Sequence, residues 1–164
     1  MDAFGRQVDA RNNFVIATSN AGTKLIQDMV VKGTESHELQ KNILEHILEE
    51  RIFAPEFVNR FDSVVVYEPL TRQDLTQIAR MKLAELKMRM AEKNIHIELH
   101  DAIHEKVAED GYDPAFGARP MNRVIDMEIG DIISQAMLTG DVTPGDRILL
   151  KPGFHRMEYL WEKL

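Results

Sequence analysis

The sequence predicts an α/β protein, in which an α/β layer is followed by a mainly helical part with a small β-sheet. Two short uninterrupted hydrophobic runs, Phe14–Ala17 and Val64–Tyr67, are typical of strands buried on both faces, as in parallel sheets. A helical pattern separates the two runs, and this order favours a layered α/β arrangement. The second half instead alternates long helical patterns with short β-like segments. The 164 residues suffice for one ordinary domain or two small ones.

In the first half, one main helix is expected between the two runs. Leu39, Ile43 and Leu48 recur at helical spacing and predict a helix over 38–52. Pro55 can begin a further short helical turn, because proline's missing N–H costs nothing at the first helical position. Residues 1–11 are polar and predict a turn or a hairpin. The boundary between the halves is expected near residues 69–71.

In the second half, Thr71 and Asp74 form a capping-box-like start for a helix that runs to about Lys93. Each side chain of such a box satisfies a backbone N–H that the first helical turn leaves unpaired. The remaining expected elements are an alternating strand at 95–99, a short helix capped by Asp101 and ended by Gly111, a long helix from Arg119 or Pro120 to Gly140, and strands at 148–150 and 157–161.

Composition excludes several classes of function. Lys and Arg number 20 against 27 Asp and Glu, which gives a net charge of −7. Nucleic-acid binders are usually basic, so we expect no nucleic-acid partner. Without cysteine the chain has no disulfide, no Cys-ligated zinc and no thiol chemistry. No hydrophobic run approaches the length of about 20 residues of a membrane span, and the start does not resemble a signal peptide. We therefore expect a soluble, cytoplasmic protein without a membrane partner.

Common catalytic motifs are also missing from the sequence. A phosphate-binding P-loop requires a Gly-Lys pair, which this chain does not contain, and no predicted buried strand ends in paired acids that would hold magnesium. His96, His100 and His104 are evenly spaced but fall on different predicted elements, so they are not expected to form a metal site. No elbow sequence supports a Ser-His-Asp triad. The chain alone is therefore not expected to be a complete ATPase or hydrolase.

Three polar residues remain as candidates for function. Asn20 follows the first predicted strand, at the edge where α/β folds place their chemistry, although a turn-forming Asn is the simpler explanation. Arg60 precedes the second predicted strand, where a surface ion pair of little energetic value would also explain it. Arg119 lies at a predicted helix start, where a cation opposes the helix dipole. Contact with an anion such as phosphate would compensate for that unfavourable position.

Four motifs occur in order along the chain: Gly5–Asp9 (Gly-Arg-Gln-Val-Asp), Ala17–Asn20 (Ala-Thr-Ser-Asn), Ala54–Asp62 (Ala-Pro-Glu-Phe-Val-Asn-Arg-Phe-Asp) and Gly111–Pro120 (Gly-Tyr-Asp-Pro-Ala-Phe-Gly-Ala-Arg-Pro). Together they resemble the carboxy-terminal half of the second AAA+ module of Clp ATPases, the ClpB, ClpC and ClpA group. The resemblance covers nearly the whole chain. It implies that residues 1–69 are the second part of the large α/β subdomain, and that residues 70–164 are the small C-terminal lid subdomain.

The resemblance also implies a role for each candidate residue. Asn20 matches the first sensor, which helps to position the attacking water near the γ-phosphate. Arg60 matches the arginine finger, which reaches the nucleotide of the neighbouring subunit, and Arg119 matches the second sensor, which contacts nucleotide within its own subunit. These assignments suit phosphoryl transfer, which depends on positioning and charge neutralisation. The nucleotide loop, the magnesium acids and the pore loop of the family are missing, so we expect the chain to be part of a longer protein.

By the same resemblance, the parent protein is expected to be an ATP-driven unfoldase or disaggregase that acts as a hexamer on unfolded or aggregated proteins. ATP and Mg²⁺ would be cofactors of the complete module, whereas this chain alone is expected to bind neither tightly. Two alternatives stay open: a non-enzymatic assembly module, and a different AAA+ unfoldase of the ClpX-like type. The Asn59–Asp62 and Gly111–Pro114 elements favour the two-ring Clp type over the ClpX-like one.

A further expectation concerns the ClpP peptidase. Clp ATPases that feed ClpP carry an exposed loop between the first sensor and the arginine finger, with a tripeptide of the Ile/Val/Leu-Gly-Phe/Leu type. Between residues 21 and 54 the only glycines are Gly22 and Gly33, and neither has hydrophobic residues on both sides. Polar neighbours would enter a pocket that requires a hydrophobic anchor. We therefore expect a ClpB-like, peptidase-independent protein.

Overall fold

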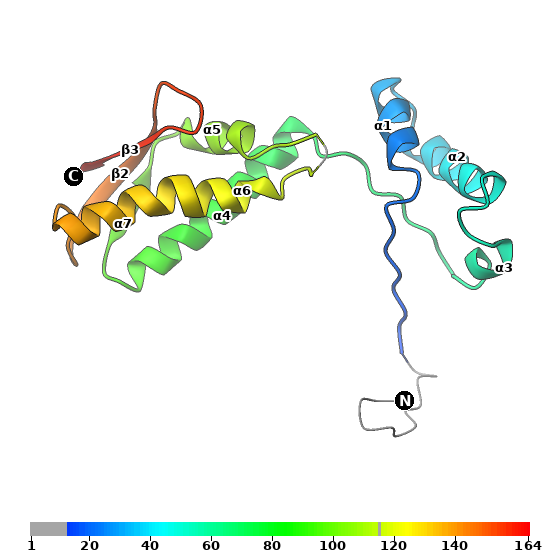
Figure 1. Cartoon of the computed structure of the whole chain (residues 1–164), viewed down its shortest axis with the longest axis horizontal. Coiled ribbons are helices and arrows are strands. Elements are labelled where there is room, and N and C mark those ends of the chain that lie inside the picture. Colours follow the sequence, from blue (N-terminus) through cyan, green and yellow to red (C-terminus); the bar gives the residue numbers. More distant parts are fainter. Residues whose placement is uncertain (1–12, 115) are drawn as a thin grey trace. The chain divides into compact units, whose positions relative to one another are not determined.

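The computed structural model describes residues 13–114 and 116–164. The chain divides into two compact units, unit 1 (Met1–Glu68) and unit 2 (Pro69–Leu164), whose elements are labelled in Figure 1. The turn or hairpin predicted for residues 1–11, and with it the Gly5–Asp9 motif, lies outside the described residues. Each unit is described below by itself.

The described part of unit 1, from residue 13 onward, contains three helices: α1 (Thr23–Val31), α2 (Ser36–Glu49) and α3 (Pro55–Val58). Gly22 precedes α1 with a φ of 73°, and Pro55 occupies the first position of α3, where its fixed φ suits a helix. The predicted helix over 38–52 therefore exists, shifted slightly toward the N-terminus. Its buried side chains face those of α1 and form a small core: Met29, Leu39, Ile43 and Ile47.

The two strands predicted in the first half do not form. Residues 14–17 and 64–67 are not assigned to any strand, and Phe14 and Tyr67 are 100% and 85% exposed. A strand requires a hydrogen-bonded neighbour for its backbone N–H and C=O groups, and no strand lies in the described part of unit 1. A side-chain hydrogen bond from Gln40 Nε2 to the Val64 carbonyl connects the second run to α2. Both runs therefore keep an extended course without pairing.

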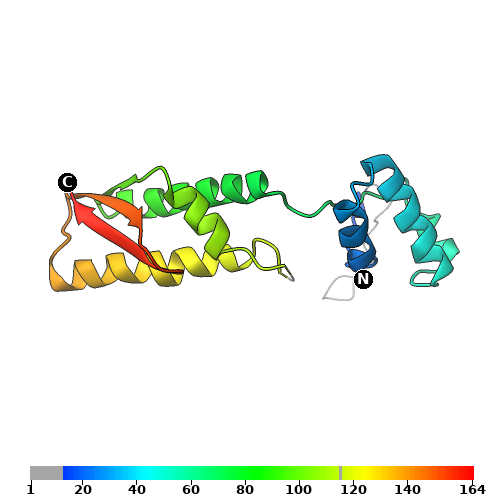
Figure 2. The ribbon, with the colours of Figure 1, turned by 90° about the horizontal axis from the view of Figure 1, so that it is seen from above.

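Unit 2 contains the larger core and most of the regular structure. Its elements, in order, are α4 (Arg72–Ala91), β1 (His96–Leu99), α5 (Ile103–Asp110), α6 (Pro120–Arg123), η1 (Val124–Ile129), α7 (Gly130–Thr139), β2 (Arg147–Pro152) and β3 (Tyr159–Lys163). In Figure 2, α4 lies along one side of unit 2, and the continuous helical segment from α6 to α7 lies along the other side. α5 and the sheet lie between them. One continuous hydrophobic core joins these elements.

The start of α4 confirms the predicted capping box. The Thr71 hydroxyl accepts a hydrogen bond from the Asp74 N–H at 3.2 Å, and the Asp74 carboxylate accepts one from the Thr71 N–H at 2.9 Å. The hydrophobic residues that α4 buries recur at helical spacing on one face of the helix: Leu75, Ala79, Leu83 and Leu86. The local pattern therefore determined both where this helix begins and which face it buries.

The sheet of unit 2 is mixed, with the strand order β1-β2-β3. β1 and β2 are parallel, and β2 and β3 are antiparallel. The only parallel pair among the described strands is therefore formed by β1 and β2, and not by the two hydrophobic runs of the first half; the connection between β1 and β2 includes α5 and α7. The last strand begins at Tyr159, two residues later than predicted, because residues 153–158 form the turn between β2 and β3.

The long helix predicted from residue 119 or 120 to Gly140 is present, but its middle is a π-helix, η1. Met121, Ile125, Ile129 and Ile133 recur every fourth residue, and all are buried. In an ideal α-helix, residues four apart drift around the axis by about 40°, so such a row would rotate off the core. A wider π turn reduces that drift and keeps the row facing the core. Gly140 ends α7 in the left-handed conformation, as predicted.

The structure confirms the predicted class, a partial α/β subdomain followed by a helical part with a small sheet. It corrects one local prediction in unit 2: Asp101 does not cap α5, which has Ala102 at its N-cap position and no side-chain cap. Among the described residues, no helix has both the length and the hydrophobicity that a membrane crossing requires.

Candidate functional site

Arg119 lies directly before α6, at the base of the loop that connects α5 to α6. Its N–H donates to the Phe116 carbonyl at 3.3 Å, and Pro120 then occupies the first helical position. The side chain is exposed, and its guanidinium makes no hydrogen bond or ion pair with any residue in 13–114 or 116–164. An unpaired cation at the start of a long helical run is electrostatically unfavourable unless an anion approaches it. Arg119 is therefore available to an external anionic group.

The loop before Arg119 is closed by main-chain hydrogen bonds. The Asp113 N–H donates to the Gly117 carbonyl at 3.0 Å, and the Gly117 N–H donates back to the Asp113 carbonyl at 2.6 Å. The Asp113 carboxylate also accepts from the Phe116 N–H at 3.1 Å. Gly117 has a φ of 63°, in the left-handed region that favours glycine. The segment between the two glycines of the motif, Gly111 and Gly117, thus forms a local hydrogen-bonded turn, and Arg119 follows this turn directly before α6.

Asn20 and Arg60 both lie in unit 1 and both are exposed. The Asn20 carbonyl accepts hydrogen bonds from the hydroxyl and the N–H of Thr23, at 2.6 and 3.4 Å, and so belongs to the turn that begins α1. Arg60 follows α3, and its N–H donates to the Phe57 carbonyl at 3.2 Å. Within the described residues, neither side chain makes a hydrogen bond or an ion pair. No contact in unit 1 brings the two side chains together.

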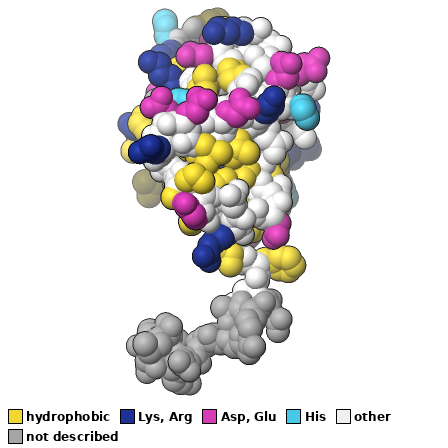
Figure 3. Space-filling view, turned by 90° about the vertical axis from the view of Figure 1, so that its right-hand side faces the viewer, with side chains coloured by type: hydrophobic (Ala, Val, Ile, Leu, Met, Phe, Trp, Pro, Cys, Tyr) yellow, Lys and Arg dark blue, Asp and Glu magenta, His cyan; other side chains and the backbone are white. Residues whose placement is uncertain are grey.

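Arg60 lies next to a row of three aromatic rings. The ring centroid of Phe57 is 5.6 Å from that of Phe53 and 5.1 Å from that of Phe61, the second pair nearly edge to face. Phe57 is nevertheless 48% exposed. Figure 3 shows the face that lies on the right-hand side in Figure 1. Hydrophobic side chains gather near the centre of this face, and charged side chains surround them. Exposed hydrophobic residues of unit 1 include Ile52, Phe57, Val65 and Tyr67.

A buried carboxylate that sequence reasoning missed lies at the end of α5. Asp110 is only 3% exposed and accepts hydrogen bonds from the Tyr159 hydroxyl at 2.9 Å and the Met157 N–H at 3.1 Å. Lys106 forms an ion pair with it at 3.2 Å. Burial raises the pKa of the Tyr159 phenol well above its ordinary value, and the hydrogen bond to Asp110 raises the pKa further. The position of Asp110, three residues after Val107 on the buried face, was the signal available in the sequence.

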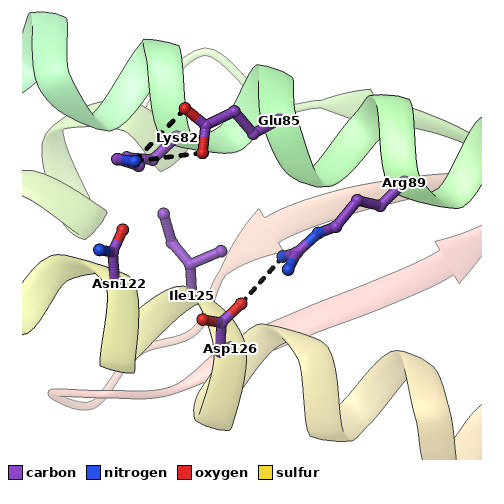
Figure 4. A pocket seen from close by; sticks show the side chains of 6 residues that line it. All are labelled: Lys82, Glu85, Arg89, Asn122, Ile125 and Asp126. Atoms are coloured by element: carbon purple, nitrogen blue, oxygen red, sulfur yellow. Dashed lines mark hydrogen bonds and ion pairs between the residues drawn. The ribbon is translucent and has the colours of Figure 1, made fainter. Parts of the chain in front are cut away.

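A shallow pocket of about 230 Å³ lies between α4 and the α6–η1 segment (Figure 4). Its charged groups are already paired with one another. Arg89 contacts Asp126 at 2.9 Å and Lys82 contacts Glu85 at 3.1 Å, as Figure 4 shows. Arg119 does not line this pocket. The pocket therefore offers no unpaired charge to a ligand.

The histidines predicted not to form a metal site lie on separate elements. His96 is in β1, His104 is in α5, and His100 lies between them, where its ring nitrogen accepts from the Ala102 N–H at 3.2 Å. In the described part of the chain, no group of three His, Asp or Glu side chains could hold a metal ion.

Comparison with protein families gives two matches that lie side by side along the chain. Residues 1–64 match the model of an AAA domain of the Cdc48 subfamily, and residues 70–150 match the model of the C-terminal, D2-small domain of ClpB protein.

Among similar proteins, the chaperone protein ClpB of Meiothermus ruber is 38% identical over 152 residues, which are 93% of this chain and 18% of that relative. The chaperone protein ClpB 2 of Nostoc sp. is 35% identical over 158 residues, covering 96% of this chain and 18% of the relative. The ATP-dependent Clp protease ATP-binding subunit ClpC of Staphylococcus saprophyticus is 35% identical over 154 residues, with coverages of 90% and 18%. The chain thus spans about a fifth of the length of these relatives.

Proposed function

Since the chain belongs to the Clp ATPases and corresponds to the C-terminal part of their second AAA+ module, we propose that it supplies the nucleotide-sensing and subunit-contact half of a protein-remodelling ATPase. The observation that carries this proposal is the exposed guanidinium of Arg119 at a helix start, which has no hydrogen-bond or ion-pair partner among the residues that the structure describes. An arginine fork matches the geometry of phosphate oxygens, and phosphate would compensate for the position's unfavourable electrostatics.

We assign residues 1–69 to the second part of the large subdomain and residues 70–164 to the lid. Two features of unit 1 support this assignment. The runs at 14–17 and 64–67 have the composition of buried strands but are exposed and unpaired here, and a larger subdomain would supply their neighbours. The exposed hydrophobic side chains of unit 1 mark a surface that is suited to burial against further protein.

Arg60 is proposed as the residue that reaches the nucleotide of a neighbouring subunit. It is exposed, and the hydrophobic and aromatic residues beside it are suited to an interface, because interface cores are enriched in aromatic side chains and arginine. Asn20 is proposed to orient the attacking water from the turn before α1. Both roles require a nucleotide site that is completed by further protein.

The residues of this chain suit a phosphate contact better than a complete cofactor site. Arg119 and Arg60 are exposed cations, whereas the described residues contain no carboxylate cluster for Mg²⁺. ATP and Mg²⁺, when bound by the complete module, would supply the phosphoryl group and neutralise its charge. The chain by itself is therefore expected to show no ATPase activity and at most weak nucleotide affinity. We further propose a cytoplasmic, hexameric parent protein that acts on unfolded or aggregated proteins.

The experiment that tests this function joins the chain to the upstream half of a ClpB second module and measures ATP binding and hydrolysis. Arg60→Ala is expected to reduce hydrolysis by about 10³-fold with little effect on binding, as for arginine fingers supplied in trans. Arg119→Ala is expected to weaken nucleotide binding. Arg123→Ala, an exposed arginine one turn further along, is the control and should change neither quantity. Unchanged binding and hydrolysis in both variants would contradict the roles proposed for Arg60 and Arg119. A joined module that neither binds nor hydrolyses ATP would favour the non-enzymatic assembly module.

Peptidase independence is supported by the connection between α1 and α2. Only residues 32–35 lie between these helices, and the N–H groups of Gly33 and Thr34 donate to the carbonyls of Val30 and Met29 at 2.9 and 3.1 Å. Gly33, with a φ of 74°, thus ends α1 rather than belonging to an extended docking loop. Degradation assays with ClpP and the complete protein test this proposal, which robust ClpP-dependent degradation would overturn.

A further inference from the structure

Gly111 lies at the point where the end of α5 meets the beginning of α6. The residue is buried, and a Cβ atom at this position would lie 2.7 Å from the Met121 Cα atom and 2.8 Å from the Met121 Cβ atom. It would also lie 2.8 Å from the Val107 carbonyl oxygen. The φ of Gly111 is −93°, which any residue can adopt. Glycine is therefore required here by the close approach of two backbone segments and not by conformation.

Met121 in turn holds the first turn of α6, which Arg119 begins. Its side chain is 1% exposed, and its N–H donates to the Ala118 carbonyl at 3.1 Å. Only one residue separates Met121 from Arg119. A shift of the Met121 backbone by the several tenths of an ångström that a methyl group demands would therefore move the Arg119 backbone with it.

We propose that Gly111 is a positioning residue for Arg119, which fixes the guanidinium by allowing the backbones of α5 and α6 to touch. This inference rests on the proposed nucleotide contact of Arg119. Bidentate contacts to phosphate are directional, and a misplacement of about 1 Å in such a group can reduce function by about 100-fold. The hydrogen bonds between Asp113 and Gly117 restrain the loop between α5 and α6. The loop therefore cannot rearrange to leave Arg119 in place when a methyl group at residue 111 displaces the Met121 backbone.

The test measures binding of a fluorescent ADP analogue to the joined module at a temperature where every variant is folded. Gly111→Ala is compared with Gly130→Ala, since both add one methyl group, but Gly130 has a helical φ of −62° and a Cβ there would have the Ile125 carbonyl oxygen as its nearest contact, at 3.5 Å. Gly111→Ala is expected to weaken binding by about tenfold or more, whereas Gly130→Ala leaves binding unchanged.

A double-mutant cycle separates positioning from a general loss of stability. If Gly111 acts through Arg119, then Gly111→Ala in the Arg119→Ala background weakens binding by less than about twofold, because the contact that it positions is already missing. Unchanged binding in Arg119→Ala alone contradicts the proposed function itself. Weaker binding in Arg119→Ala, together with an additive effect or no effect of Gly111→Ala, contradicts only the positioning role.

A second pair of variants keeps the inference testable if Gly111→Ala does not fold. Asp113→Ala removes the carboxylate that accepts the Phe116 N–H, whereas Asp113→Asn retains an acceptor oxygen in the same place. We expect Asp113→Ala to weaken nucleotide binding and Asp113→Asn to restore most of it. Equal binding by the wild type and by Asp113→Ala would overturn the view that this loop positions Arg119.

Discussion

The Tyr159→Phe substitution should destabilise unit 2 by removing one hydrogen bond from a buried carboxylate. Tyr159 is 4% exposed, and its hydroxyl donates to Asp110 Oδ2 at 2.9 Å. Phenylalanine keeps the ring and its packing, so the substitution opens no large cavity. Asp110 retains its contacts with the Met157 N–H and with Lys106. The measured difference therefore reports mainly on the lost hydrogen bond.

The expected magnitude follows from the charge and burial of the acceptor. A hydrogen bond to a charged group contributes about 1.5–3 kcal/mol, compared with about 1 kcal/mol for a neutral pair. We expect the free energy of unfolding to fall by about 2 kcal/mol. With a urea m-value of about 1 kcal/mol per molar, the midpoint of unfolding would shift by about 2 M.

The same contact predicts a dependence of stability on alkaline pH. Burial and the hydrogen bond to Asp110 raise the pKa of Tyr159 in the folded state, so the folded protein holds the phenolic proton more tightly than the unfolded chain. This contribution is fully present below the ordinary tyrosine pKa of about 10. Above that pH it is lost at up to about 1.4 kcal/mol per pH unit. The Tyr159→Phe variant has no phenol to ionise and so lacks this loss. The difference in the free energy of unfolding between wild type and variant therefore becomes smaller as the pH rises above about 10.

Urea titrations followed by Trp161 fluorescence provide the assay. Trp161 is the only tryptophan of the chain and packs against the core of unit 2, so its emission reports on that unit. Tyr112→Phe is the matched control, because Tyr112 lies in unit 2 but is 40% exposed. A free energy of unfolding for Tyr159→Phe within about 0.5 kcal/mol of the wild-type value at pH 7 would refute the reasoning. Retention of the full alkaline loss by the variant would also refute it.

Two further predictions concern unit 2 and a surface control. Thr71→Ala removes the N-cap of α4 and should lower the free energy of unfolding by about 1 kcal/mol at neutral pH. The hydrogen bonds from the Thr71 hydroxyl and then the Thr71 N–H lower the pKa of Asp74. The part that depends on the hydroxyl is present above the ordinary carboxyl pKa and is lost as the pH falls, so acid titrations should show the difference between the two proteins becoming smaller. It should not vanish, because the bond from the Asp74 N–H to the hydroxyl does not depend on the carboxylate charge. Lys106→Met leaves the buried Asp110 charge without its cation and should cost about 3 kcal/mol in the same urea assay. Lys82→Met, which breaks a more exposed pair within unit 2, should cost less than about 0.5 kcal/mol, and equal losses in the two lysine variants would contradict the assignment.

The helices of unit 2 could be predicted from the sequence because their signals are local. The capping box at Thr71 and Asp74 and the left-handed stop at Gly140 depend on neighbours within four residues, which any short window of sequence contains. The start of α6 at Pro120 and the exposure of Arg119 follow from the same kind of signal. The candidate site was therefore located by local chemistry and by motif resemblance.

Tertiary structure decided the features that depend on residues far apart in the chain. The hydrophobic runs at 14–17 and 64–67 have strand-like composition, but a strand also needs a partner, and their composition does not reveal whether one is present. Asp110 is 49 residues from Tyr159, and only the packing of α5 against the sheet shows that its charge is buried and hydrogen-bonded. The requirement for glycine at residue 111 likewise follows from a backbone approach to Met121 that no local pattern encodes. Local propensities act within a turn or two of chain, whereas pairing, burial and close packing exist only after the chain has folded.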